Sequence, residues 1–201
     1  SMTRRTGESV DIVTYIESFN LFDLLVILIF AVSFVIGFIQ GTIRRLLGIA
    51  SILFSFLLAA NLRDPLGTFF APHWTQFPPG YSYMIAFGLV FVTATIVFSL
   101  VIQGFYHHQP LFAKSTIVDE VLGGVLGVVQ AMLVLGFVII ILDSYFNTPG
   151  AAETNGEVIF LRPLWNAIDA SGIVHLYRET LIPAFMAIFG GLLPEAVRDT
   201  V

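Results

Sequence analysis

The sequence predicts an all-α protein built on a four-transmembrane-helix bundle, with short amphipathic helices at the N-terminus and in the C-terminal tail. Two observations lead to this prediction. Hydrophobic residues make up 57% of the 201 residues and charged residues only 11%, whereas charged residues make up about 25% of an average soluble domain. The few charges are also unevenly spaced, so that they leave four long segments without any charge. The mean hydropathy of +0.90 agrees with a membrane protein.

Each charge-free segment can form a helix that crosses a bilayer. The hydrocarbon core is about 30 Å thick and requires roughly 20 apolar residues in a helix. A charge placed in mid-membrane is costly, so uninterrupted apolar segments of this length are a strong signal. Core helices of a soluble protein are the alternative, but such helices normally carry a charged face. We expect spans over about residues 24–40, 46–62, 83–105 and 121–142.

These spans divide the chain into three parts. Residues 1–20 contain a short amphipathic segment, residues 21–145 form the transmembrane domain, and residues 146–201 form an amphipathic tail. The apolar run 181–193 is too short to span the bilayer, so we expect an interfacial or a re-entrant helix there. Two stripes at helical spacing support this prediction; they are Leu161, Leu164, Trp165 and Ile168, and then Leu181, Phe185, Ile188 and Leu192.

The connections between spans differ in character. Residues 41–45 predict a tight turn, whereas residues 63–83 contain several prolines, Pro65 among them, and Trp74. The latter composition predicts an interfacial loop with aromatic anchors. The first turn carries Arg44 and Arg45, and the loop between the third and fourth spans carries Lys114. From residue 143 onward there are seven acidic residues and three arginines. The positive-inside rule therefore predicts that the loops 41–45 and 107–120 are cytoplasmic and that both termini are extracytoplasmic.

Glycines are concentrated at the predicted cytoplasmic ends of the first and fourth spans. Small residues four positions apart let two helices approach closely, either within one chain or between protomers of a homo-oligomer. We therefore expect helix packing at these positions, which are Gly37, Gly41, Gly123, Gly124 and Gly127.

A few polar residues are candidates for specific interactions. Arg44 and Asp119 are candidates for an ion pair that clamps two helix ends; alternatively, Arg44 and Arg45 extend toward lipid headgroups. Gln40 and Gln130 must find partners inside the membrane, either as links between helices or as the lining of a polar path. Asp23 is suited to cap a helix start.

Several classes of function are not indicated. The net charge of −5 and the absence of a basic stripe argue against nucleic-acid binding. The adjacent histidines 107 and 108 face different ways on a helix, so we expect no metal site. No G-x-S-x-G motif occurs, the spans hold no acid or histidine suited to catalysis, and the partial P-loop echo at 113–116 lacks its glycines. We therefore expect no enzyme and no cofactor.

Two motifs resemble those of the CvpA (colicin V production protein) family. One is Asp23 at the start of an apolar helix that leads into the run 37–46, GFIQGTIRRL; the other is the run 119–127, DEVLGGVLG. The resemblance covers roughly residues 23–143. Gln40, Glu120 and Gln130 stand where the family usually has basic residues. The resemblance implies an inner-membrane protein connected with colicin V production and envelope homeostasis, without a defined chemistry.

The leading functional hypothesis is therefore a non-enzymatic scaffold for export or envelope maintenance. It would act in the lipid bilayer, with a periplasmic or membrane protein as partner, and without nucleic acid. The alternative is a small channel or transporter, which with four spans per chain requires an oligomer.

Overall fold

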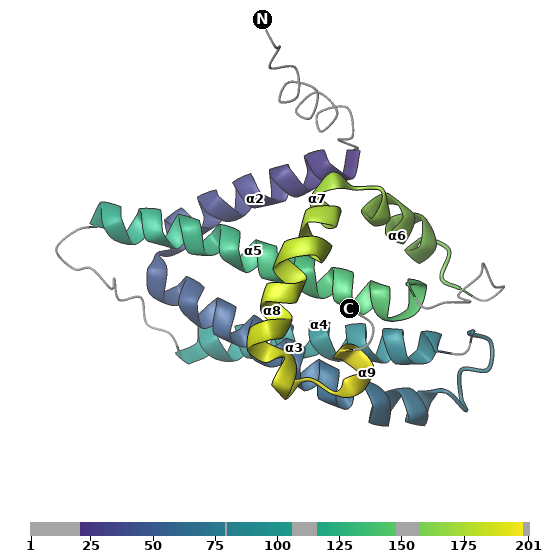
Figure 1. Ribbon diagram of the computed structural model, residues 1–201. Helices are drawn as coiled ribbons and strands as arrows, with labels where there is room; N and C mark the ends of the chain where they lie inside the picture. Colours follow the sequence, from purple (N-terminus) through teal and green to yellow (C-terminus); the bar gives the residue numbers. More distant parts are fainter. Residues whose placement is uncertain (1–20, 79, 106–115, 148–156, 199–201) are drawn as a thin grey trace, which may run out of the picture.

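The computed structural model describes residues 21–78, 80–105, 116–147 and 157–198. It contains four long helices, and no strand occurs in these ranges. The helices are α2 (Leu21–Gln40), α3 (Thr42–Phe70), α4 (Tyr81–Phe105) and α5 (Thr116–Phe146) (Figure 1). All four are long and apolar enough to cross a membrane. The predicted all-α fold with four membrane helices is confirmed. The predicted N-terminal helix, the loop around Lys114 and the two adjacent histidines lie outside the described residues.

The helices do not pair in chain order. Helix α2 lies along α5, while α3 packs against α4 and α5. The consecutive helices α2 and α3 share few contacts, because they diverge beyond the turn that joins them. Only α3 and α4 therefore form a closely packed hairpin of neighbours in sequence, and α5 is the element that connects α2 to the rest of the bundle.

Helix α3 is longer at both ends than the predicted span. It begins at Thr42, because Gly41 alone reverses the chain with a φ of 77°. It also continues through Pro65 to Phe70, so the prediction of a loop from residue 63 was wrong. A proline inside a helix removes one N–H donor and leaves a carbonyl four residues earlier without its partner. Asn61 and Pro65 are both exposed, so this carbonyl can be solvated at the end of the helix.

The core is most aromatic where the long helices meet the tail. Phe56 of α3 is fully buried and stacks on Phe137 of α5, with ring centroids 3.9 Å apart. Phe91 of α4 meets both rings edge-on. Phe185 of the tail also packs edge-on against Phe56 and Phe137. Edge-to-face arrangements of this kind are a favoured geometry of aromatic pairs.

The tail forms a layer across the long helices. Its elements are α6 (Leu161–Asp169), α7 (Gly172–Leu176), a π-helical stretch (Tyr177–Leu181), α8 (Ile182–Phe189), a 3₁₀ turn (Gly190–Leu192) and α9 (Glu195–Arg198). In Figure 1 the continuous column from α7 to α8 runs across α5 and α3 and not alongside them. The ring contacts of Phe185 show that this crossing is a direct contact.

The packing face of α8 differs from the predicted stripe. Ile182 is buried and Phe185 is partly buried, but Ile188 is 74% exposed and Leu192 is 61% exposed. Leu192 lies in the 3₁₀ turn, where the helical spacing no longer applies.

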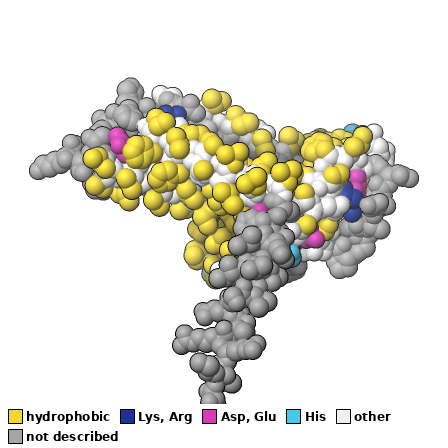
Figure 2. All heavy atoms as spheres, turned by 90° about the horizontal axis from the view of Figure 1, so that it is seen from above, with side chains coloured by type: hydrophobic (Ala, Val, Ile, Leu, Met, Phe, Trp, Pro, Cys, Tyr) yellow, Lys and Arg dark blue, Asp and Glu magenta, His cyan; other side chains and the backbone are white. Residues whose placement is uncertain are grey.

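The surface has the polarity expected of a protein in lipid. Large hydrophobic side chains such as Leu28 on α2 and Leu100 on α4 are more than 60% exposed. In Figure 2 hydrophobic side chains cover the long body, and charged side chains are seen mainly toward its two ends. An apolar surface of this extent is rare on soluble monomers, but lipid tails solvate it without cost.

Candidate functional site

The first candidate region is a glycine seam between α2 and α5, formed by Gly37, Gly123 and Gly127. A methyl group on Gly123 would lie 2.5 Å from the carbonyl oxygen of Gly37. Methyl groups on Gly37 and Gly127 would collide with the carbonyl oxygens of Gly123 and Ser33. Because the neighbouring atoms are backbone, they cannot move aside. The two helices therefore approach so closely that only glycine fits at the seam.

The two other predicted glycines lie beside this seam. A methyl group on Gly124 would meet the ring of Phe34 at 2.8 Å. Gly41 faces the carboxylate of Asp119, at 2.6 Å from the position of an added methyl group, and its positive φ disfavours any other residue. The structure thus places all five glycines where α2 and the turn after it meet α5.

Thr42 connects this turn to the start of α5. Its hydroxyl donates to the backbone carbonyl of Asp119 at 2.9 Å, and its backbone N–H donates to the Asp119 carboxylate at 3.4 Å. Thr42 and Asp119 are both buried. Arg44 forms no ion pair with Asp119, so the expected Arg44–Asp119 clamp between the two helix ends is absent. The link between the two helix ends is made by a threonine, which sequence reasoning did not single out.

Arg45 is the polar centre of this end of the bundle. Its side chain is 9% exposed, and its Nη1 donates to the Oε1 of Gln130 at 2.8 Å. Gly48, one turn along α3, leaves the space in which the Gln130 amide lies, because an added methyl group would be 3.1 Å from it. Gln130 therefore links two helices through Arg45.

The polar residues predicted from sequence converge only in part. Gln40, Arg44, Arg45 and Gln130 line one pocket of about 150 Å³, together with Gly48, Ser99 and Ile102. Asp119 and Asp23 lie elsewhere. The pocket gathers side chains from all four long helices.

The second candidate region is the ion-paired cap, which we define as tail residues 157–198; it crosses the long helices, and its ion pairs lie toward the end of the bundle opposite to the glycine seam. Arg178 donates from Nε and Nη2 to the two oxygens of Asp143 at 2.9 and 2.7 Å, a bidentate pair. Its Nη1 donates to Asp169 at 2.6 Å. Trp165 donates its indole N–H to Asp143 at 3.0 Å. The carboxylate of Asp143 is thus satisfied by two elements of the cap.

Asp23 holds the cap to α2. Its fully buried carboxylate accepts a very short hydrogen bond from the hydroxyl of Ser171 and one at 3.2 Å from the backbone N–H of Ile173. The Ser171 hydroxyl also accepts from the N–H of Val174 and so caps α7. Asp23 therefore accepts hydrogen bonds from the start of α7, more than 140 residues away in sequence.

A third group of contacts holds the start of the cap. The Glu157 carboxylate accepts hydrogen bonds from Nη2 and Nε of Arg162 at 2.5 and 2.6 Å. It also accepts one from the hydroxyl of Tyr145 at 3.1 Å. The hydroxyl of Tyr81 accepts from the backbone N–H of Val158 at 3.0 Å. Residues from α4 and α5 thereby fix the segment that leads into α6.

The local environment shifts the pKa of two groups in the cap. Burial lowers the pKa of Arg178, but hydrogen bonds and charges from Asp143 and Asp169 outweigh it, so the net pKa is raised. The guanidinium therefore stays charged. Burial raises the pKa of the Tyr177 phenol above its usual value, so this group stays neutral. Within the described residues the Tyr177 hydroxyl is buried and has no hydrogen-bond partner.

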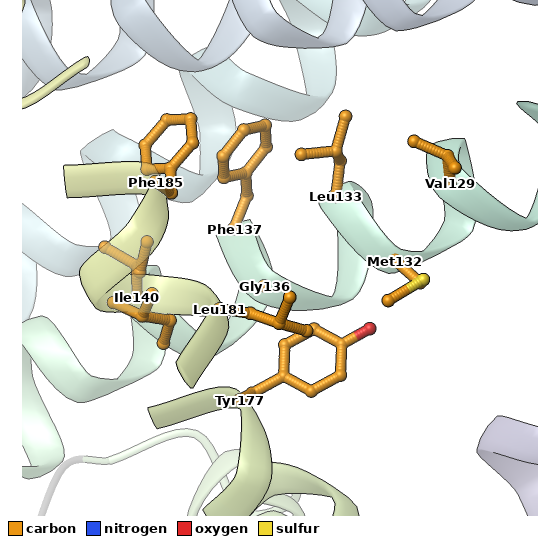
Figure 3. A pocket seen from close by; sticks show the side chains of 10 residues that line it. Val129, Met132, Leu133, Gly136, Phe137, Ile140, Tyr177, Leu181 and Phe185 are labelled. Carbon is orange, nitrogen blue, oxygen red and sulfur yellow. The ribbon is translucent and has the colours of Figure 1, made fainter. Parts of the chain in front are cut away.

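An apolar pocket of about 190 Å³ lies where the cap crosses α5. Figure 3 shows side chains of α5, such as Met132 and Phe137, facing Tyr177, Leu181 and Phe185 from the cap. The Tyr177 ring lies beside Leu181, with its oxygen toward Met132. Apart from that hydroxyl, the labelled side chains offer nothing that can bind a polar ligand.

Taken together, these contacts can hold the helices and the cap in place. Among the residues that the structure describes, no three histidines or carboxylates lie close enough to hold a metal ion. Sequence reasoning missed Arg178, Ser171 and Trp165 as partners of the two aspartates. The only available signal was the scarcity of charge, since each buried aspartate in such a chain requires a partner.

A family model described as Colicin V production protein matches residues 22–176. Comparisons with curated proteins and with solved structures find no match.

Proposed function

Because the chain belongs to the colicin V production protein family, we propose that it acts as a non-enzymatic scaffold of a bacterial inner membrane. In this role it supports export of colicin V-type toxins or maintenance of the envelope. The family match and the four apolar helices make it a multi-pass membrane protein. Its function as a platform for other proteins is the part that we propose.

The observation that carries the proposal is the fixed position of the cap. The cap is joined to α2 through Asp23 and to α5 through Asp143, and both aspartates are buried. A buried carboxylate is stable only when it is paired and hydrogen-bonded, so each contact resists separation. The result is a rigid surface at one end of the bundle, which is what a docking platform requires.

The test is to crosslink a partner protein to the exposed surface of the cap. Ile159 and Ile188 are 92% and 74% exposed; a photo-crosslinking amino acid at each position in living cells should give one discrete adduct with another protein or with a second copy. Leu28 on α2, which is 62% exposed, is the control position. The same chain should restore colicin V secretion to a strain that lacks its own family member. Absence of both adducts and of restored secretion would contradict the scaffold role.

We also propose that the pocket end faces the cytoplasm and the cap faces the periplasm, as the positive-inside rule predicts. The chain has no cysteine, so a single introduced cysteine is the only site that a maleimide can label, and its labelling shows on which side of the membrane it lies. A membrane-impermeant maleimide should label Glu195→Cys in intact cells, and Ile117→Cys only after permeabilisation. The reverse pattern would show that the orientation is inverted.

A small channel is the second candidate, because Gln40, Arg45 and Gln130 line a common polar pocket. Four further pockets among the described residues have largely apolar linings. These pockets do not form a continuous polar path through the described part of one chain, so we infer that a pore would require several copies. Ion flux through liposomes that falls on Gln40→Leu substitution would favour this candidate, and absence of flux would exclude it.

A further inference from the structure

The polar pocket at the glycine-rich end has an unusual charge balance. It is lined by two guanidinium groups, Arg44 and Arg45, and by the amides of Gln40 and Gln130. Ser99 contributes a hydroxyl from α4. None of the described side chains that line it is a carboxylate. Among the described residues, every charged group in the pocket is therefore positive, in a chain whose net charge is −5.

Arg45 is buried, and no carboxylate of the described residues forms an ion pair with it. Its only hydrogen bond in the described structure goes to the neutral oxygen of Gln130, and its Nε is buried without any partner. Neither Arg44 nor Arg45 forms an ion pair with a described carboxylate. Arg162 and Arg178 in the cap, by contrast, each pair with a carboxylate at 2.7 Å or less.

This contrast matters because a buried charge is expensive. A guanidinium removed from water is destabilising by several kcal/mol unless a counter-charge and hydrogen bonds compensate. An arginine that merely extends to the headgroup region would keep its charged end in water. Arg45 does not do so, since it is 9% exposed. An anion that enters the pocket would supply the missing compensation.

We propose that this pocket binds a phosphate group, with Arg45 and Arg44 as its cationic ligands and Ser99 and Gln40 as further hydrogen-bond donors. The planar fork of arginine matches phosphate oxygens, and its charge-assisted hydrogen bonds are about twice as strong as neutral ones. The pocket volume of about 150 Å³ is roughly ten times the ~15 Å³ that one water needs. A phosphate group therefore fits.

The phosphate belongs either to a lipid headgroup or to a free anion, and both present the same oxygens. The pocket lies at the ends of membrane-spanning helices, where headgroups are abundant. The site goes beyond the scaffold role and does not depend on it, because it concerns the end of the bundle opposite to the cap.

The experiment measures thermal stabilisation of the full chain, purified in a neutral detergent and stripped of lipid. Four additives are titrated: phosphatidylglycerol, a diacylglycerol with the same acyl chains, sodium phosphate, and sodium chloride at matched ionic strength. We expect phosphatidylglycerol to raise the melting temperature and diacylglycerol to leave it unchanged. Stabilisation by sodium phosphate beyond that by sodium chloride would assign the site to a free anion instead. Either result supports a phosphate site.

Single substitutions test whether the thermal stabilisation arises from binding in this pocket. Arg45→Gln should weaken the response at least tenfold in concentration. Because this change also removes the partner of Gln130, Ser99→Leu is the second variant: it fills the pocket from α4 and leaves both arginines in place. Arg198→Gln, in α9 and outside the pocket, is the matched control and should respond as the unmodified chain does. If no phosphate compound stabilises the chain, or if both pocket variants respond normally, the proposal is wrong.

Discussion

The two ends of the bundle are held together by different physics. At the glycine seam the stabilising feature is the absence of side chains, which brings the backbones of α2 and α5 into contact at Gly37, Gly123 and Gly127. At the ion-paired cap the stabilising feature is long charged side chains, with Arg178 bridging Asp143 and Asp169. Enlarging a side chain should therefore be most destabilising at the seam, whereas removing the charged partner of a buried aspartate should be most destabilising in the cap.

The largest effect is expected at the seam. Gly127→Leu places a side chain against the carbonyl of Ser33, and overpacking against rigid backbone should be destabilising by about 3 kcal/mol or more. We expect loss of the folded species in detergent, measured by size-exclusion chromatography and thermal unfolding. Gly104→Leu on α4 is the control, because no atom lies within 4 Å of its added methyl group. Equal stability of the two variants would show that the seam is not closely packed.

The next effect is expected in the cap. Arg178→Gln leaves the buried Asp143 without its ion pair, and loss of one partner of a partly exposed pair should be destabilising by about 2–3 kcal/mol. The change should release the cap, so limited proteolysis should cut residues 157–198 faster while the four spans remain intact. Arg198→Gln removes a half-exposed arginine from a 3.6 Å pair and should leave the cleavage rate unchanged.

A smaller loss is expected at Trp165. Trp165→Phe keeps a ring to stack on Phe146 but removes the N–H that donates to Asp143. Because Arg178 still satisfies that carboxylate, we expect a loss of about 1 kcal/mol, measured as a shift in the thermal unfolding of the cap. A loss as large as that of Arg178→Gln would mean that the indole, and not the ion pair, anchors α6.

The smallest effect at neutral pH is expected at Tyr177. Its buried hydroxyl has no partner in the described structure, so Tyr177→Phe should be neutral or slightly stabilising at pH 7. Its pKa is raised by burial. Above about pH 10 the undocked tyrosine ionises while the docked one does not, so stability falls as pH rises, by about 1 kcal/mol at pH 11. Tyr177→Phe should not show this loss of stability between pH 10 and pH 11. Identical pH profiles would show that the phenol is solvated.

The difference between the glycine seam and the ion-paired cap also explains which features could be predicted from the sequence. The four spans follow from missing charges, and the seam glycines stand out because small residues recur four positions apart. The partner of Asp143 is Arg178, 35 residues away, and that of Asp23 is Ser171, 148 residues away. Periodicity carries no information about such distant pairs. The predicted start of the loop at residue 63 was wrong, because an exposed helix end can accommodate Pro65 and α3 continues to Phe70.

The central claim is that the cap is fixed to the bundle by its charged contacts. Because the chain has no cysteine, spin labels at Ile188→Cys in α8 and Leu100→Cys in α4 can report one distance by double electron–electron resonance. In lipid nanodiscs we predict a single narrow distance distribution that broadens when Arg178→Gln is added. A broad distribution in the labelled chain with Arg178 intact would contradict the claim.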